Sequence, residues 1–145
     1  MASVAAILGA EQGAYEWPGR NCITTALALY RALAETPRPE VMAAWQEAAA
    51  LSEKRAWAKV LAEGGPLAHH RALLGEQMQQ VEELEPGALV FFHGTISVGG
   101  DYFHARPSEE GMGFCDESYT VLHWAPIGLR PVRSPYPPHS IWRIA

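Results

Sequence analysis

Apolar residues recur at helical spacing through the first half of the chain. The segment 22–35 follows this period with five apolar residues, Ile23, Ala26, Leu27, Tyr30 and Leu33, and a helix there should end before Pro37. A second helix is predicted over about 39–62, ended by Gly64-Gly65-Pro66. A short third helix is predicted over 66–74, because proline is tolerated in the first turn of a helix.

The pattern changes at Pro86-Gly87, where short apolar runs separated by turn residues begin. These runs predict strands, and they read ALVFF, GMGFC, YTVLHW, IGLRPV and SIWRI. Helices followed by a short-stranded sheet predict an α+β fold with one domain over 1–145, helical over about 1–85 and sheet over about 86–145. We expect the ALVFF strand to be central in a small antiparallel sheet, because an unbroken apolar run indicates burial on both faces.

Composition and charge exclude several classes of partner. A chain of 145 residues is the usual size of one domain. Its formal net charge of −5 provides no basic field for phosphates, so nucleic acid is disfavoured. No stretch approaches the ~20 apolar residues of a membrane helix. The opening MASVAAILGA lacks a basic flank, so we expect no signal peptide and synthesis in the cytoplasm.

The chain holds two cysteines, Cys22 and Cys115, whose different settings do not indicate a disulfide framework. An aromatic, turn-forming segment, 15–21, delivers Cys22 to the first turn of the predicted helix. Free N–H groups and the helix dipole there would stabilise a thiolate and could receive an oxyanion. The alternative is that Cys22 is a small buried apolar residue, and Cys115 is expected to have a packing role.

A second motif bears on the role of Cys22. Residues 87–92 read Gly-Ala-Leu-Val-Phe-Phe, and together with Asn21-Cys22 they resemble the NlpC family of papain-like cysteine peptidases. In that family an Asp-Cys pair opens the first helix, and a Gly-Asp-Leu-Val-Phe-Phe strand leads into the catalytic sheet. Here Ala88 and Asn21 stand where the family has aspartates.

The same resemblance suggests a triad with one member missing. The family's next strand reads His-x-Gly-Ile/Val, followed about a dozen positions later by a polar residue, often histidine. Gly113-Phe114 matches the Gly-Ile step, which places Gly111 at the position of the general-base histidine. His123 lies at the third, orienting position, although it could instead be a core or surface histidine bonded to a backbone carbonyl.

His104 is the best substitute for the missing base, if 105–110 form a loop ahead of the strand. The alternative is that His104 is a solvated loop histidine.

The other histidines have weaker claims to a role in the site. His93 is expected in a loop, and His139 among prolines has no evident partner. The adjacent His69 and His70 diverge on a helix and make a poor metal site. A zinc site built from His93, His104 and Cys115 lacks a recognisable ligand spacing.

The resemblance runs from about Tyr15 to Trp142 and is closest to a branch associated with phage tails and gene-transfer particles. It implies two functions. In the first, Cys22, His104 and His123 cleave peptidoglycan stem peptides without a cofactor. In the second, an inactive component docks neighbouring tail or particle proteins. Either implies synthesis in a bacterial cytoplasm and assembly into a virion or tail tip.

Two further groups have expected roles. Trp17 and Trp124 are the tryptophans expected to line a groove near Cys22, and the others to pack as anchors. The acidic cluster Glu82, Glu83 and Glu85 is expected to be a solvated connection, although an acidic face could also meet a basic partner.

Overall fold

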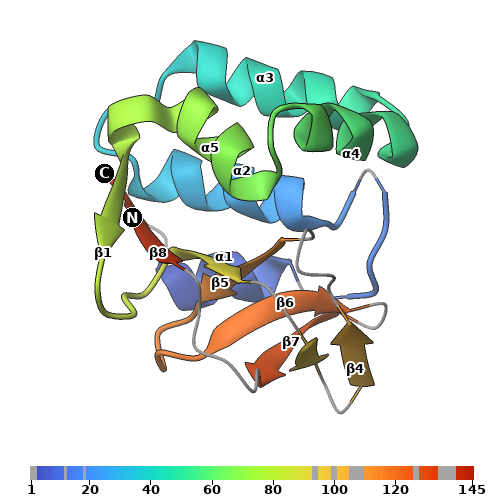
Figure 1. Cartoon of the computed structure of the whole chain (residues 1–145). Coiled ribbons are helices and arrows are strands. Elements are labelled where there is room, and N and C mark those ends of the chain that lie inside the picture. Colours follow the sequence, from blue (N-terminus) through green and yellow to red (C-terminus); the bar gives the residue numbers. More distant parts are fainter. Residues whose placement is uncertain are drawn as a thin grey trace.

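The computed structural model describes residues 3–11, 13–17, 19–92, 95–98, 101–104, 110–125, 128–133 and 140–145, with the backbone alone for 95–98, 101–104, 125 and 133. Across these residues the chain is α+β, as predicted, with a layer of helices packed on an antiparallel sheet (Figure 1). The α-helices are α1 Val4–Ala10, α2 Cys22–Leu33, α3 Pro39–Ala50, α4 Glu53–Ala62 and α5 Pro66–Leu74.

The predicted helices over 22–35 and 66–74 are confirmed as α2 and α5. The prediction of a single helix over 39–62 is wrong. The predicted helix over 39–62 is two helices, α3 and α4. Leu51 is extended, with ψ 162°, and the Ser52 hydroxyl accepts the Arg55 N–H at 3.3 Å. A serine that caps a new helix competes with continuation of the old one, and apolar periodicity does not register that break.

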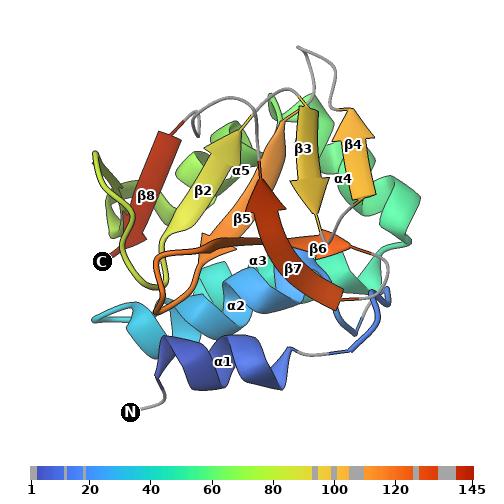
Figure 2. The same ribbon diagram turned by 90° about the horizontal axis from the view of Figure 1, so that it is seen from below.

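The sheet has the strand order β1-β8-β2-β5-β6-β7-β3-β4, and all the described pairs are antiparallel. The strands are β1 Met78–Val81, β2 Leu89–Phe92, β3 Thr95–Val98, β4 Asp101–His104, β5 Gly111–Cys115, β6 Val121–Ala125, β7 Gly128–Arg133 and β8 Ser140–Ile144. Figure 2 shows β2 between β8 and β5, with α2 and α3 behind the sheet.

The predicted central strand is confirmed as β2. Leu89 and Phe91 belong to the core shared with the helices, whereas Val90 and Phe92 pack with Ala88 on the opposite side. The four residues of β2 are between 0% and 2% exposed. Burial on both faces explains why this strand shows no alternation of polar and apolar residues.

Besides the short 3-10 helix Gly75–Gln77, one α-helix and three strands of the described residues lie outside the predicted set. β1 pairs with β8. It spans 78–81, before Pro86-Gly87, so the sheet includes a segment of the half that was predicted to be helical. β3 and β4 form a hairpin that joins the sheet through β7. α1 is a short helix begun by Ser3, whose hydroxyl accepts the Ala6 N–H at 3.1 Å. Within the described residues, no helix combines the length and apolar character needed to cross a membrane.

Candidate functional site

Cys22 is the first residue of α2, and the preceding turn fixes it there. The backbones of Glu16 and Arg20 exchange hydrogen bonds of 2.9 and 2.7 Å, which closes a tight turn. Asn21 is fully buried, and its Oδ1 accepts the N–H groups of Ile23 at 2.9 Å and Thr24 at 3.2 Å. The Thr24 hydroxyl accepts the Asn21 N–H at 3.0 Å, which completes a capping box.

The Cys22 side chain borders a pocket of about 140 Å³ between the start of α2 and the sheet. Its wall holds His123 from β6 and Gly111 from β5, so the structure places the predicted nucleophile and the predicted orienting residue in one pocket. The described residues that line it are Tyr15, Cys22, Trp57, Glu110, Gly111, Met112, His123 and Trp124. Most of these residues are partly exposed, and Met112 and Trp124 are buried.

The surroundings of the Cys22 sulfur favour the protonated thiol. Burial raises the pKa of Cys22 to about 12, and the negative charge of Glu53 adds to the increase. The backbone N–H groups of Cys22 and Ile23 oppose this effect without overcoming it. Glu53 also accepts a hydrogen bond from the Tyr15 hydroxyl. The pKa below that of a free thiol, which the position at a helix N-terminus suggested, is therefore not found here.

His123 is also uncharged at neutral pH. Burial lowers its pKa to about 4, and a hydrogen bond with the Trp124 backbone offsets part of that effect. Its ring lies against the Phe92 ring, with centroids 5.7 Å apart. A neutral thiol and a neutral imidazole therefore face this pocket, instead of the thiolate and imidazolium of an activated cysteine.

Position 111, where the family has its general-base histidine, has no room for a side chain larger than that of glycine. It pairs with Phe92 across β2 and β5, and a Cβ atom added to Gly111 would lie 2.4 Å from Phe92 Cε2. The Phe92 ring is 2% exposed and packed with Ala88, Val90 and Cys115. The volume that a side chain at 111 would enter is therefore already filled by an aromatic ring.

Gly111→Ala is expected to lower the free energy of unfolding by about 1–3 kcal/mol, because the added methyl overpacks the Phe92 ring. Urea denaturation measures the change. Gly9→Ala is the matched control, since Gly9 lies in α1 with nothing within 4 Å of an added Cβ. That control should stabilise the protein by about 0.5–1 kcal/mol, through helix propensity. Equal effects at the two positions would contradict the packing described for Gly111.

His104 lies on β4, with its backbone paired to Thr95. In the strand order, β6, β7 and β3 stand between β5 and β4. The His104 side chain lies outside the described residues, as do His93, His139 and the segment 105–109. The assignment of His104 as the base therefore stays a prediction.

His69 and His70 contribute to a second cavity beside Cys22, which the sequence did not indicate. This cavity of about 20 Å³ has room for about one water molecule. Its lining is Cys22, Ile23, Ala56, Trp57, Val60, Pro66, His69, His70 and Met112. His69 Nδ1 contacts the Glu63 carboxylate. In the described part of the chain, no three His, Cys, Asp or Glu side chains are grouped to hold a metal ion.

His70 is a buried, neutral core histidine. Its Nδ1 lies 2.7 Å from the Pro66 carbonyl oxygen, which identifies that nitrogen as the protonated one. The His70 ring lies 6.0 Å from the Trp45 ring and 5.8 Å from the Phe91 ring. Burial lowers the pKa of His70 to about 4, so the imidazole is an uncharged part of the core between α5 and β2.

The lowered pKa of His70 predicts a loss of stability in acid. The unfolded chain binds a proton near pH 6.5 and the folded chain only near pH 4. The stabilisation is therefore complete above pH 6.5 and is lost as the pH falls towards 4. His70→Asn keeps a donor for the Pro66 carbonyl, and it should reduce the acid-induced loss of unfolding free energy between these values by about 2 kcal/mol. Urea denaturation at several pH values measures this, and an unchanged pH dependence would contradict it.

The tryptophan predictions are half correct. Trp124 lines the pocket, and its indole N–H donates to Thr25 Oγ1 at 3.0 Å. Trp57 from α4 takes the place expected for Trp17, whose indole N–H instead donates to the Leu51 carbonyl at 2.9 Å.

Cys115 is fully buried in the cluster that contains Phe92, and burial raises its pKa to about 11, in agreement with the expected packing role.

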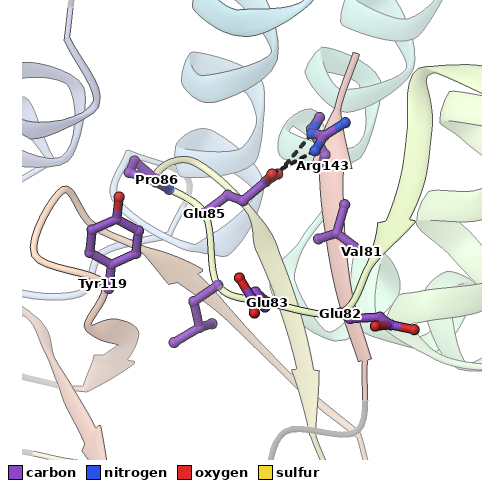
Figure 3. Close-up of a pocket in the computed structure, with 8 residues that line it drawn as sticks. Val81, Glu82, Glu83, Glu85, Pro86, Tyr119 and Arg143 are labelled. Atoms are coloured by element: carbon purple, nitrogen blue, oxygen red, sulfur yellow. Dashed lines mark hydrogen bonds and ion pairs between the residues drawn. The ribbon is translucent and has the colours of Figure 1, made fainter.

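The acidic cluster forms part of a surface hollow distant in sequence from Cys22. Figure 3 shows Glu85 reaching Arg143 of β8, with Glu82 and Glu83 beside it. The Arg143 guanidinium donates to both Glu85 oxygens, at 2.5 and 2.7 Å, and this lowers the pKa of Glu85. The segment connects β1 with β2. Glu82 and Glu83 are exposed, consistent with the expected solvated connection, whereas Glu85 is half-buried.

No protein-family model matches the chain, and neither the curated proteins nor the solved structures contain a significant match to it. The chemistry of the pocket is therefore inferred from its own residues.

Proposed function

We propose that this chain is an NlpC-like domain without peptidase chemistry, which serves as a structural component of a phage tail or gene-transfer particle and docks neighbouring subunits. The observation that carries the proposal is the state of the site around Cys22. The thiol has a pKa of about 12, and His123 in the same pocket has a pKa of about 4. The position expected to hold the base is Gly111, which is packed against Phe92.

These features bear directly on nucleophilic catalysis. A cysteine hydrolase needs a thiolate, or a base within about 2.6 to 3.2 Å that removes the thiol proton as attack begins. Here the nearby acidic group, Glu53, raises the thiol pKa. The Ile23 and Thr24 N–H groups, which could otherwise stabilise an oxyanion, are bonded to Asn21 Oδ1. Among the described residues, thiolate formation at Cys22 and the supply of free N–H donors from Ile23 and Thr24 are therefore both disfavoured.

The second candidate is a cysteine peptidase acting on peptidoglycan stem peptides. The observation in its favour is that Cys22 begins α2 and borders the same pocket as His123. In that mechanism Sγ bonds to the amide carbon, the C–N bond breaks, and His104 passes the thiol proton to the departing amine. Water then hydrolyses the thioester, while His123 orients the base. No cofactor is needed.

A docking role agrees with the net charge of the chain and with the aromatic residues that line the pocket. The net charge of −5 disfavours nucleic acid and favours partners with basic surfaces. The pocket beside Cys22 has aromatic residues, which are enriched where proteins contact one another. Proteins encoded beside this chain in its genome are the partners that the proposal requires.

The test is reconstitution with those neighbouring proteins, followed by size-exclusion chromatography. The wild type and Cys22→Ser should enter the same complex in equal amounts, because docking does not use thiol chemistry. DNA should not bind at moderate salt. A complex that depends on Cys22 reactivity, or the absence of any complex, would contradict the docking function.

A further inference from the structure

Three aromatic side chains in the pocket beside Cys22 hold one another in place. The Tyr15 and Trp124 rings meet edge to face, with centroids 6.1 Å apart and planes at 71°. The Tyr15 hydroxyl donates to Glu53 and accepts a hydrogen bond from the Trp57 side chain. The rings are therefore oriented by contacts within the protein before any ligand arrives.

One carboxylate lines this pocket, and a second lies next to one of its lining residues. Glu110 is part of the lining, and one of its carboxylate oxygens accepts the N–H of Leu67 in the first turn of α5, which fixes the position of the carboxylate. The Glu53 carboxylate lies beside Tyr15. Among the described residues, no lysine or arginine lines the pocket, and the pKa values of Cys22 and His123 leave both groups neutral at pH 7.

From this arrangement we infer that the pocket binds the alkyl ammonium group of a lysine side chain on a partner protein. The inference rests on the proposed docking function and specifies what the pocket recognises in the partner. An ammonium group is attracted to the faces of tryptophan and tyrosine rings and to a carboxylate. The alkyl stem of lysine would pack against the apolar parts of Met112 and Trp124.

The size of the pocket favours a single side chain. Its volume of about 140 Å³ is well below the roughly 300 to 1,000 Å³ of pockets that enclose whole small-molecule ligands. An acidic side chain would meet the Glu110 and Glu53 charges, which disfavours it. An uncharged side chain of the same length would gain the apolar contact and lose the attraction to the rings and the carboxylate.

The test compares two probes with unbranched four-carbon side chains, of which only the first ends in an ammonium group: Nα-acetyl-lysine methylamide and Nα-acetyl-norleucine methylamide. Each is titrated into the full chain and followed by NMR. The lysine probe should bind about tenfold more tightly than the norleucine probe. Glu110→Gln keeps an acceptor for the Leu67 N–H and removes the charge, and it should weaken binding of the lysine probe about tenfold. Glu83→Gln, in the surface hollow, is the matched control and should leave binding unchanged.

Equal binding of the two probes, or lysine binding unaffected by Glu110→Gln, would overturn the inference. The same variant separates it from the docking function. If the complex with neighbouring proteins forms equally well with Glu110→Gln, the lysine site is wrong and docking stands. If no complex forms while the lysine probe still binds selectively, docking is wrong and the lysine site stands.

Discussion

Cys22 is expected to react with iodoacetamide at pH 7 about 50-fold more slowly than a free cysteine. The rise in the pKa of Cys22 from 9.0 to about 12 reduces the thiolate fraction about a thousandfold. A more basic thiolate is intrinsically more nucleophilic, and with a Brønsted coefficient of about 0.4–0.5 this recovers roughly 20-fold of the loss. Peptide mapping by mass spectrometry measures the rate at each cysteine separately.

The control for this rate is a Cys115→Ser chain, in which Cys22 is the remaining thiol. Glu53→Gln should accelerate the reaction, because it removes a negative charge that raises the thiol pKa. Alkylation as fast as that of free cysteine at pH 7 would mean that a cation, such as the His104 imidazolium, lies near the sulfur.

Phe91→Ala is expected to lower the free energy of unfolding by about 3–5 kcal/mol, the usual cost of removing a buried aromatic ring. Phe91 is fully buried at the centre of the sheet, and its ring lies 5.8 Å from the ring of His70 in α5. The cavity would therefore open between the sheet and the helical layer. Urea denaturation of the whole chain measures the loss.

Leu61→Ala is the control, because Leu61 is 61% exposed on α4 and its truncation should change stability by less than about 0.5 kcal/mol. Similar losses at Phe91 and Leu61 would contradict the two-layer packing of β2 beneath the helices.

The parts of the fold that could be predicted from the sequence are those with a strong local signal. The apolar period of 22–35 and the unbroken run Leu89–Phe92 both correspond to the observed elements, α2 and β2. β1 was missed because its sequence, Met-Gln-Gln-Val, has two exposed glutamines and little apolar content. It is a strand because β8 supplies the hydrogen-bond partners, and such pairing between distant segments leaves no local pattern.

The candidate site was predictable only in outline. The segment preceding Cys22 indicated a cysteine at a helix start, and the resemblance to the NlpC family suggested His123 as its orienting residue. Both residues border one pocket. The electrostatics could not be predicted, because the group that raises the thiol pKa, Glu53, is 31 residues from Cys22 in sequence. Helix position alone predicts a lowered pKa. Burial and a nearby carboxylate reverse that direction, and both arise from tertiary packing.

We propose that Cys22 does not act as a nucleophile on cell-wall peptides. The most direct test incubates the wild type and Cys22→Ser with purified peptidoglycan stem peptides and follows new amino termini by mass spectrometry. The two proteins should release the same background amount of new amino termini. Cleavage by the wild type that disappears in Cys22→Ser, and that falls by about 10²-fold or more in His104→Ala, would contradict the account and establish the peptidase.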